Sequence, residues 1–161
     1  VRRSYNHRGA SFLEIYQNCN IFNDGAFELF TESTTKKDST LFMEHDKPLV
    51  FGQNNDKGIL LDGYSPRVVS LANGEFSTND LWIHNEYDLV KAQILSRFFD
   101  LPQQFAEGGT FLPRPFGVFY IEETRPAYEE LVHYQIQHAL DVKGKGNLDD
   151  LIAGSVTWVH E

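Results

Sequence analysis

Cysteine occurs once in this chain, at position 19, within the stretch SFLEIYQNCNIFND (residues 11–24). The apolar run before it predicts a buried strand over residues 11–18, which places Cys19 at the strand's C-terminal end. In an α/β sheet, that end is where functional groups are usually presented. The neighbouring polar residues are typical of turns: Asn18, Asn20 and Asn23. A single thiol in this position has two interpretations, a small apolar filler or one ligand to a group whose other ligands lie outside this chain.

The remaining residues that could do chemistry do not form a recognisable motif. The chain has six histidines, but His133 and His138 are five positions apart and would lie on different faces of a helix, so no zinc spacing is present. Glu44-His45-Asp46 is interpreted as a solvated face. The glycine pairs in EGGTF and KGKGN lack the strand–turn–helix context of a phosphate loop, and no nucleophile elbow occurs.

Composition narrows the class of protein. The chain has 161 residues, a formal charge of −9 and 41% hydrophobic residues, which predicts one globular domain or slightly more. The acidic balance and the lack of a Lys/Arg cluster argue against nucleic acid as a partner. No apolar stretch approaches the roughly 20 residues of a membrane span, and no signal peptide is visible. Because one cysteine cannot form an intramolecular disulfide, we expect a cytoplasmic protein.

The first half of the chain predicts an α/β domain with a small antiparallel appendage. A short helix around residues 26–31 is followed by an exposed loop. Leu49–Phe51 and Gly58–Leu61 flank the polar turn GQNND, which predicts a β-hairpin, and residues 66–71 could add a third strand.

The second half predicts two longer helices and one strand. Residues 77–81 offer N-cap candidates for a helix that runs through residue 100, with a buried face of Leu89, Val90, Ile94, Leu95 and Phe98. Residues 101–117 are predicted as a loop, and Gly117–Ile121 as a buried strand. A second helix begins near Pro126, with Glu129 and Glu130 in its first turn. A short helix over residues 148–154 is predicted to be docked by Trp158.

Four stretches carry a resemblance to a known family. HRGASFLEIYQNCNIFND (residues 7–24) closely resembles a segment of the thiamine-diphosphate-binding β subunits of 2-oxoacid:ferredoxin oxidoreductases, in which a strand ends at a cysteine followed by Phe-Asn. RPFGVFYIEETRPAYEE (residues 114–130) looks like a later segment of those subunits. Residues 41–51 and 77–91 look like the version that acts on 2-oxoglutarate. The resemblance covers most of this chain but only the C-terminal half of such a subunit.

The resemblance implies a function that the residues alone do not. It implies oxidative decarboxylation of a 2-oxoacid to acyl-CoA, and the resemblance is strongest to the type of enzyme that uses 2-oxoglutarate. The implied cofactors are thiamine diphosphate, Mg²⁺ and a 4Fe-4S cluster. It implies an α subunit, ferredoxin and coenzyme A as partners. Cys19 would be the fourth ligand of the cluster, and Asn23 and Asp24 would line the approach to the thiamine, with a simple turn as the alternative.

The resemblance also implies how the chain is divided. Residues 1–40 would end the thiamine-diphosphate-binding α/β domain, and residues 41–161 would form a C-terminal extension that contacts another subunit. The family's paired cysteines and its Gly-Asp-Gly … Asn element do not occur here. We therefore expect a fragment, or a separately supplied half of a subunit, that binds neither cofactor alone.

Two other classes of function remain open. One is a non-catalytic, acidic α+β interaction domain whose exposed aromatic residues dock a partner and whose cysteine is structural. The other is a thiamine enzyme of the transketolase type, which needs no iron–sulfur cluster and therefore no cysteine at the strand end.

Overall fold

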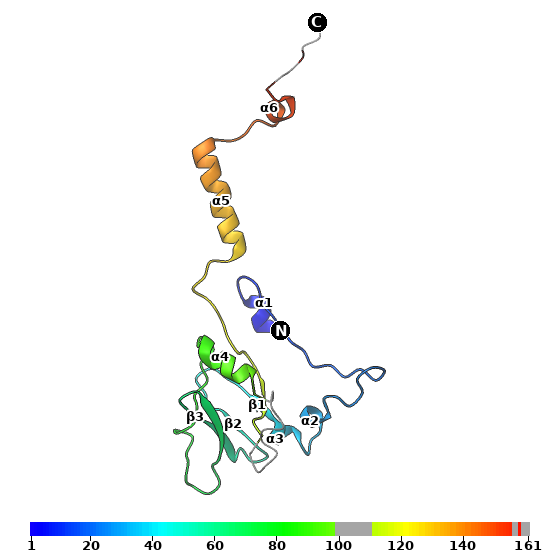
Figure 1. Ribbon diagram of the computed structural model, residues 1–161, viewed down its shortest axis with the longest axis vertical. Coiled ribbons are helices and arrows are strands. Elements are labelled where there is room, and N and C mark those ends of the chain that lie inside the picture. The colour runs from blue at the N-terminus through cyan, green and yellow to red at the C-terminus, as the bar shows by residue number, and fades with distance from the viewer. Residues whose placement is uncertain (99–110, 156–157, 159–161) are drawn as a thin grey trace. The chain divides into compact units, whose positions relative to one another are not determined.

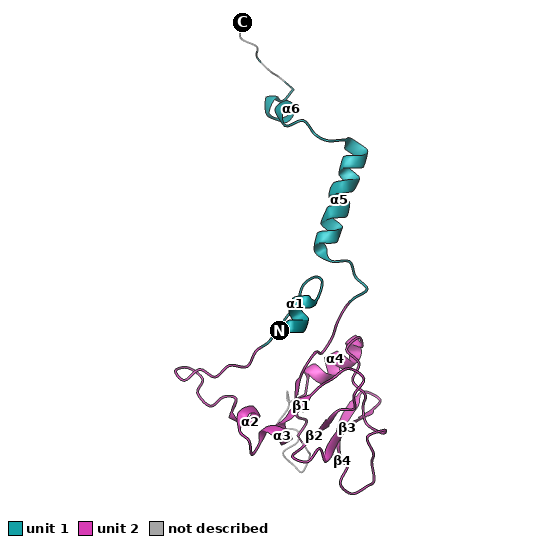
Figure 2. Cartoon of the chain, turned by 180° about the vertical axis from the view of Figure 1, so that it is seen from behind, with its two compact units in different colours: residues 1–14, 123–161 teal, residues 15–122 magenta. Residues whose placement is uncertain are grey.

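A computed structural model describes residues 1–98, 111–155 and 158 of the chain. The chain forms two units, one of residues 1–14 and 123–161 and the other of residues 15–122 (Figure 2). Helices and strands are mixed, as the predicted α/β class requires. The predicted division at residue 40 separates the end of a thiamine-diphosphate-binding domain from a C-terminal extension. It stays a prediction.

The antiparallel appendage is present in the larger unit. Strands β2 (Val50–Phe51), β3 (Lys57–Asp62) and β4 (Ser65–Ser70) form a three-stranded sheet in that order. Phe51 pairs with Lys57, so the hairpin and its third strand are confirmed. The intervening turn holds Gly52 at φ 99° and Asn55 at φ 54°, backbone conformations that these two residue types adopt most readily.

A second, parallel pair of strands was not predicted. β1 (Thr40–Phe42) pairs with β5 (Arg114–Phe116), and Leu41 lies opposite Pro115. Beyond the pair, Met43 N–H donates to the Phe116 carbonyl over 2.8 Å. Gly117 follows at φ 136°, and a Cβ there would lie 2.7 Å from the Met43 carbonyl oxygen, so only glycine fits.

Two predictions for the second half are wrong at this strand. The strand predicted at Gly117–Ile121 lies earlier, at residues 114–116, in a stretch predicted as a loop because of its prolines. A proline is tolerated in a strand at the edge of a sheet. The chain after Gly117 pairs with another segment instead, since Ile121 N–H donates to the Glu86 carbonyl over 2.7 Å. Residues 101–110 of the predicted loop lie outside the described residues.

Three helices of the larger unit are α2 (Glu28–Thr31), α3 (Lys36–Ser39) and α4 (Leu89–Ser96) (Figure 1). The first matches the prediction, whereas the second lies where an exposed loop was expected. α4 begins later than predicted, because Asp88 is its N-cap and accepts from Lys91 N–H over 3.0 Å. Leu95 and Phe98 are buried as expected, but Leu89 and Val90 are exposed.

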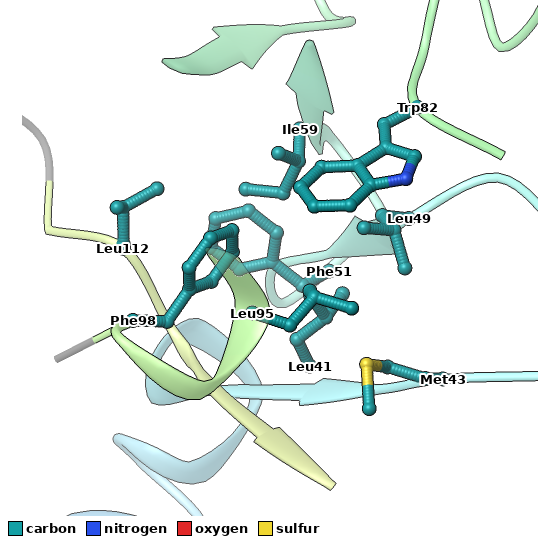
Figure 3. Packing of buried hydrophobic residues seen from close by; sticks show 9 residues of the cluster. All are labelled: Leu41, Met43, Leu49, Phe51, Ile59, Trp82, Leu95, Phe98 and Leu112. Carbon is teal, nitrogen blue, oxygen red and sulfur yellow. The ribbon is translucent and has the colours of Figure 1, made fainter. Parts of the chain in front are cut away.

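The core of the larger unit joins β1, the antiparallel sheet and α4 (Figure 3). Trp82 and Phe98 meet edge to face at 6.1 Å between ring centroids. The backbone N–H of Trp82 donates to the Ile59 carbonyl over 2.8 Å, which ties the segment of Trp82 to β3. Nine buried side chains form the cluster: Leu41, Met43, Leu49, Phe51, Ile59, Trp82, Leu95, Phe98 and Leu112.

The smaller unit consists of α1 (Arg2–Asn6), α5 (Tyr128–Lys143) and α6 (Leu148–Ala153). α5 and α6 match the predicted helices. Glu130, in the first turn of α5, accepts from Ala127 N–H over 2.9 Å and forms an ion pair with Arg8. The predicted docking of Trp158 is wrong, since this residue is 96% exposed. Within the described ranges, no helix combines the length and the apolar character needed to cross a membrane.

Candidate functional site

The loop that carries Cys19 is closed by the side chain of Asn18. Asn18 Nδ2 donates to Asp24 Oδ1 over 2.9 Å, and Asn18 Oδ1 accepts from Gly25 N–H over 3.1 Å. A backbone bond from Asn23 N–H to the Cys19 carbonyl, at 2.9 Å, narrows the loop further. Gly25 ends it at φ 75°, in the left-handed region. Three bonds therefore hold residues 18–25 in one conformation around the thiol.

Cys19 is a partly buried residue, and its thiol lies within reach of backbone donors. The N–H of Phe22, followed by those of Ile21 and Asn23, stabilises the thiolate and lowers the pKa of Cys19, while partial burial opposes the change. A lowered pKa makes a cysteine a better metal ligand and a better nucleophile at neutral pH. The loop thus favours the ionised form of its sulfur.

The segment before Cys19 is not the buried strand that was predicted. Residues 10–18 are in no strand, and Phe12 and Ile15 are exposed. A strand needs a neighbouring strand to take up its backbone N–H and C=O groups, and no strand of the described residues pairs with this segment. Cys19 therefore lies in a hydrogen-bonded loop rather than at the end of a strand.

Aromatic residues attach the Cys19 segment to β5. Tyr16 stacks on Phe27 at 4.8 Å between centroids and meets the edge of Phe116 at 5.6 Å. The guanidinium of Arg114 lies 5.9 Å from the ring centroids of both Tyr16 and Phe30, within the range of a cation–π interaction. No role was predicted for Arg114 or Phe116, because nothing in the sequence signals that β5 lies beside residue 16.

A cleft of about 380 Å³ lies between the Cys19 loop and the aromatic cluster of Tyr16, Phe27, Phe30 and Phe116. Asn18, Asp24 and Gly25 contribute to one wall, and the aromatic rings of the cluster contribute to the other. Its remaining lining is largely acidic or hydroxylic: Glu28, Thr31 and Glu32. The cleft lies beside the candidate ligand loop.

Asp24 and Asn23 both have contacts within the loop. Asp24 contacts Asn18 through its side chain, and Asn23 contacts Cys19 through its backbone. Both residues are exposed, and the Asp24 carboxylate is bonded to Asn18. These contacts support the interpretation of Asn23 and Asp24 as part of a turn. Their place near the thiamine stays a prediction. Asn18, one of the three asparagines predicted to form a turn, is the residue whose side chain holds the loop closed. Its signal in the sequence was an asparagine six positions before the Asp-Gly pair.

Elsewhere, two histidines of the larger unit have structural contacts. His84 is fully buried, and its Nε2 lies 2.8 Å from the Val118 carbonyl, to which the Nε2–H tautomer donates. His45 Nδ1 accepts from Glu86 N–H over 3.3 Å. Glu44 and Asp46 are exposed, in agreement with the predicted solvated face. In the part of the chain that the structure describes, no group of three or more His, Cys, Asp or Glu residues could hold a metal ion.

Comparison with known proteins gives one informative likeness. The chain is 27% identical over 162 residues to the 2-oxoglutarate oxidoreductase subunit KorB of Mycobacterium tuberculosis. This chain is similar to KorB. The alignment covers 98% of this chain and 40% of the length of KorB, so the predicted resemblance to a subunit of a 2-oxoacid oxidoreductase is confirmed. No protein-family model matches the chain, and no solved structure matches it.

Proposed function

We propose that this chain is part of a 2-oxoacid:ferredoxin oxidoreductase that acts on 2-oxoglutarate. The likeness to KorB across nearly the whole chain carries this proposal. In the proposed reaction, 2-oxoglutarate and coenzyme A give succinyl-CoA and carbon dioxide, and two electrons pass singly to ferredoxin. An α subunit and ferredoxin would be the protein partners of the assembled enzyme.

In this proposal Cys19 supplies one thiolate of a 4Fe-4S cluster. The donor type fits, because iron in such clusters is held by cysteine thiolates, normally four. The loop fits as well, since the N–H groups of Phe22 and Ile21 favour the thiolate. The cluster, when bound, accepts electrons one at a time, and the chain's own contribution is to hold one sulfur ionised and in place. The other three thiolates would come from elsewhere in the enzyme, because the chain has a single cysteine.

Thiamine diphosphate and Mg²⁺ would be held mainly by residues outside this chain, which has no Gly-Asp-Gly element. Within the chain, Asn23 and Asp24 are proposed to line the approach to the thiamine, since both are exposed on the loop that carries Cys19. Asp24 would do so as part of the closed loop, because its carboxylate is already bonded to Asn18.

The test is Cys19→Ser in the assembled enzyme. We expect loss of iron, of the visible absorbance of the cluster and of ferredoxin reduction. Asn20→Ser is the matched control, since it places the same residue type one position away, and it should leave all three unchanged. Full iron content and full ferredoxin reduction in Cys19→Ser would refute the ligand role.

The same variants separate the alternatives. A thiamine enzyme of the transketolase type would keep its activity in Cys19→Ser. A non-catalytic interaction domain would be colourless with or without iron and would reduce no ferredoxin in any assembly. Only the proposed function predicts that cluster and electron transfer are lost together.

A further inference from the structure

The loop that follows β4 holds an asparagine with a glycine directly after it. Ten asparagines occur in the sequence, and Asn73 is the only one of them that precedes a glycine, Gly74. The side-chain amide of an asparagine can be attacked by the backbone nitrogen of the next residue, because the two atoms are spaced to close a succinimide ring. This attack meets least hindrance at glycine, which has no Cβ. Asn73-Gly74 is therefore the pair in this chain best suited to such a reaction.

The turn at Asn73 prepares its amide for attack. Glu75 N–H donates to Asn73 Oδ1 over 3.3 Å. The ring that this bond closes contains both Asn73 Cγ and the Gly74 nitrogen, so the amide carbon is folded back over the backbone. During the attack, negative charge develops on Oδ1, and a backbone N–H already directed at that oxygen stabilises the charge. The same bond thus positions the amide carbon and polarises its carbonyl.

The backbone nitrogen of Gly74 is unhindered. Its N–H donates to no acceptor among the described residues, so no hydrogen bond has to break before solvent removes its proton. Asn73 and Gly74 are both exposed, and a Cβ built on Gly74 would have no atom within 4 Å. There is therefore room for the tetrahedral carbon that the attack creates.

The loop is anchored on both sides, so a change within it should stay local. On one side, Leu71 N–H donates to the Asp56 carbonyl over 2.8 Å. On the other, Ser77 donates to the Asp80 carboxylate from its N–H over 2.8 Å and from its hydroxyl over 2.7 Å. Residues 72–76 lie between these contacts, and none of them belongs to the hydrophobic core. A change in the backbone of this loop should therefore leave the core intact.

We propose that Asn73-Gly74 is a site of spontaneous deamidation. The Gly74 nitrogen loses its proton to solvent and bonds to Asn73 Cγ; the bond from Cγ to Nδ2 breaks, and Nδ2 takes up a proton and leaves as ammonia. Water then adds across either C–N bond of the succinimide, which gives aspartate or isoaspartate at position 73. Nothing is oxidised or reduced. This inference does not rest on the proposed function.

The reaction changes the charge of the loop. The formal charge of the chain, −9, becomes more negative by one. Glu75 Oε2 now accepts from Asn73 Nδ2 at 3.5 Å, and after deamidation a carboxylate faces a carboxylate there. The attraction becomes a repulsion, so the modified turn should open.

Incubation of the 161-residue chain in mildly alkaline buffer, followed by peptide mapping at mildly acidic pH, tests the proposal. We expect isoaspartate at position 73, detected by mass spectrometry and by methylation with a protein isoaspartate methyltransferase, and later elution of the intact chain from an anion exchanger. Asn73→Gln should abolish these changes, because glutamine closes a larger ring much more slowly. Asn79→Gln makes the same substitution at another exposed asparagine and should leave the yield unchanged. An unmodified wild-type chain, or modification mainly at another asparagine, would overturn the proposal.

Two rate comparisons test the roles of Gly74 and of the turn. Gly74→Ala should slow the reaction by about tenfold or more, because a Cβ hinders the attacking nitrogen. In urea, Glu75 N–H no longer holds the amide, so the folded chain should react at least as fast as the unfolded chain. A rate indifferent to Gly74→Ala would contradict the mechanism, and a slower reaction in the folded chain would show that the turn protects Asn73 and would overturn the proposal.

Discussion

Replacing Asn18 by aspartate tests whether this side chain sets the chemistry of Cys19. Asn18→Asp keeps an acceptor for Gly25 N–H but removes the donor to Asp24, and it brings two carboxylates together where the atoms now lie 2.9 Å apart. The loop should open, and the N–H groups of Phe22 and Ile21 should no longer be aligned on the sulfur. Because those groups lower the pKa of the Cys19 thiol, the pKa should rise towards that of free cysteine.

The size of the effect follows from the contacts that are lost. An exposed hydrogen bond contributes about 0.5 kcal/mol net, and two unit charges about 4 Å apart in water repel by about 1 kcal/mol. Together these terms disfavour the closed loop by about 1.5 kcal/mol, or about tenfold in the ratio of closed to open loop. Asn18→Ala loses two hydrogen bonds without the repulsion, so its closed-to-open ratio should fall only about fivefold.

The assay is the rate of alkylation of Cys19 by iodoacetamide as a function of pH, which reports one site because the chain has one cysteine. The midpoint of the profile, rather than the rate itself, separates a change in pKa from a change in exposure. The exchanged variant Asn18→Asp/Asp24→Asn has the wild-type composition and restores the bond with its polarity reversed, so the midpoint should return. An unchanged midpoint in Asn18→Asp, or no recovery in the exchanged variant, would refute this account of the loop.

Two further predictions concern the fold. Gly117→Ala should destabilise the larger unit by roughly 2–3 kcal/mol, because the methyl group would lie 2.7 Å from the Met43 carbonyl oxygen at φ 136°; urea unfolding measures this, and Gly146→Ala, with open space around it, should cost under about 1 kcal/mol. The pKa of Asp80 is lowered by the Ser77 hydroxyl and then by the Ser77 N–H, so Ser77→Ala should raise that pKa in a carboxyl NMR titration. A lowered aspartate pKa stabilises the fold fully at pH above the ordinary aspartate value. The stability difference between wild type and Ser77→Ala should therefore shrink below that pH and vanish as pH falls through the lowered pKa.

Local signals predicted the elements whose partners are close in the sequence. The hairpin was predictable because its strands flank the turn from Gly52 to Asp56 and pair with each other. α5 was predictable from its period and its acidic first turn. The start of α4 was misplaced because residues 77–81 and Asp88 are equally good caps by type, and only tertiary packing selects Asp88.

Long-range pairing was not predictable in the same way. Nothing local to Thr40–Phe42 indicates that its partner is the proline-containing segment Arg114–Phe116. For the candidate site, the sequence singled out Cys19 but placed it on a strand, because an apolar run such as residues 11–16 has the same pattern whether or not a neighbouring strand exists to pair with it. The closure by Asn18 depends on side-chain geometry that no spacing rule specifies.

The parallel pairing of β1 with β5 has a consequence for the order of folding. Leu41 and its partner Pro115 are separated by about 70 residues, whereas the strands of the antiparallel sheet are joined by short turns. Bringing β1 and β5 together therefore costs more chain entropy than forming the antiparallel sheet. As the polypeptide leaves the ribosome, β1 emerges well before its partner. The stretch between them can collapse first. When β5 arrives, it brings Phe116 and Arg114 against the aromatic side chains beside the cysteine segment, so that this region would be the last part of the larger unit to become ordered during synthesis.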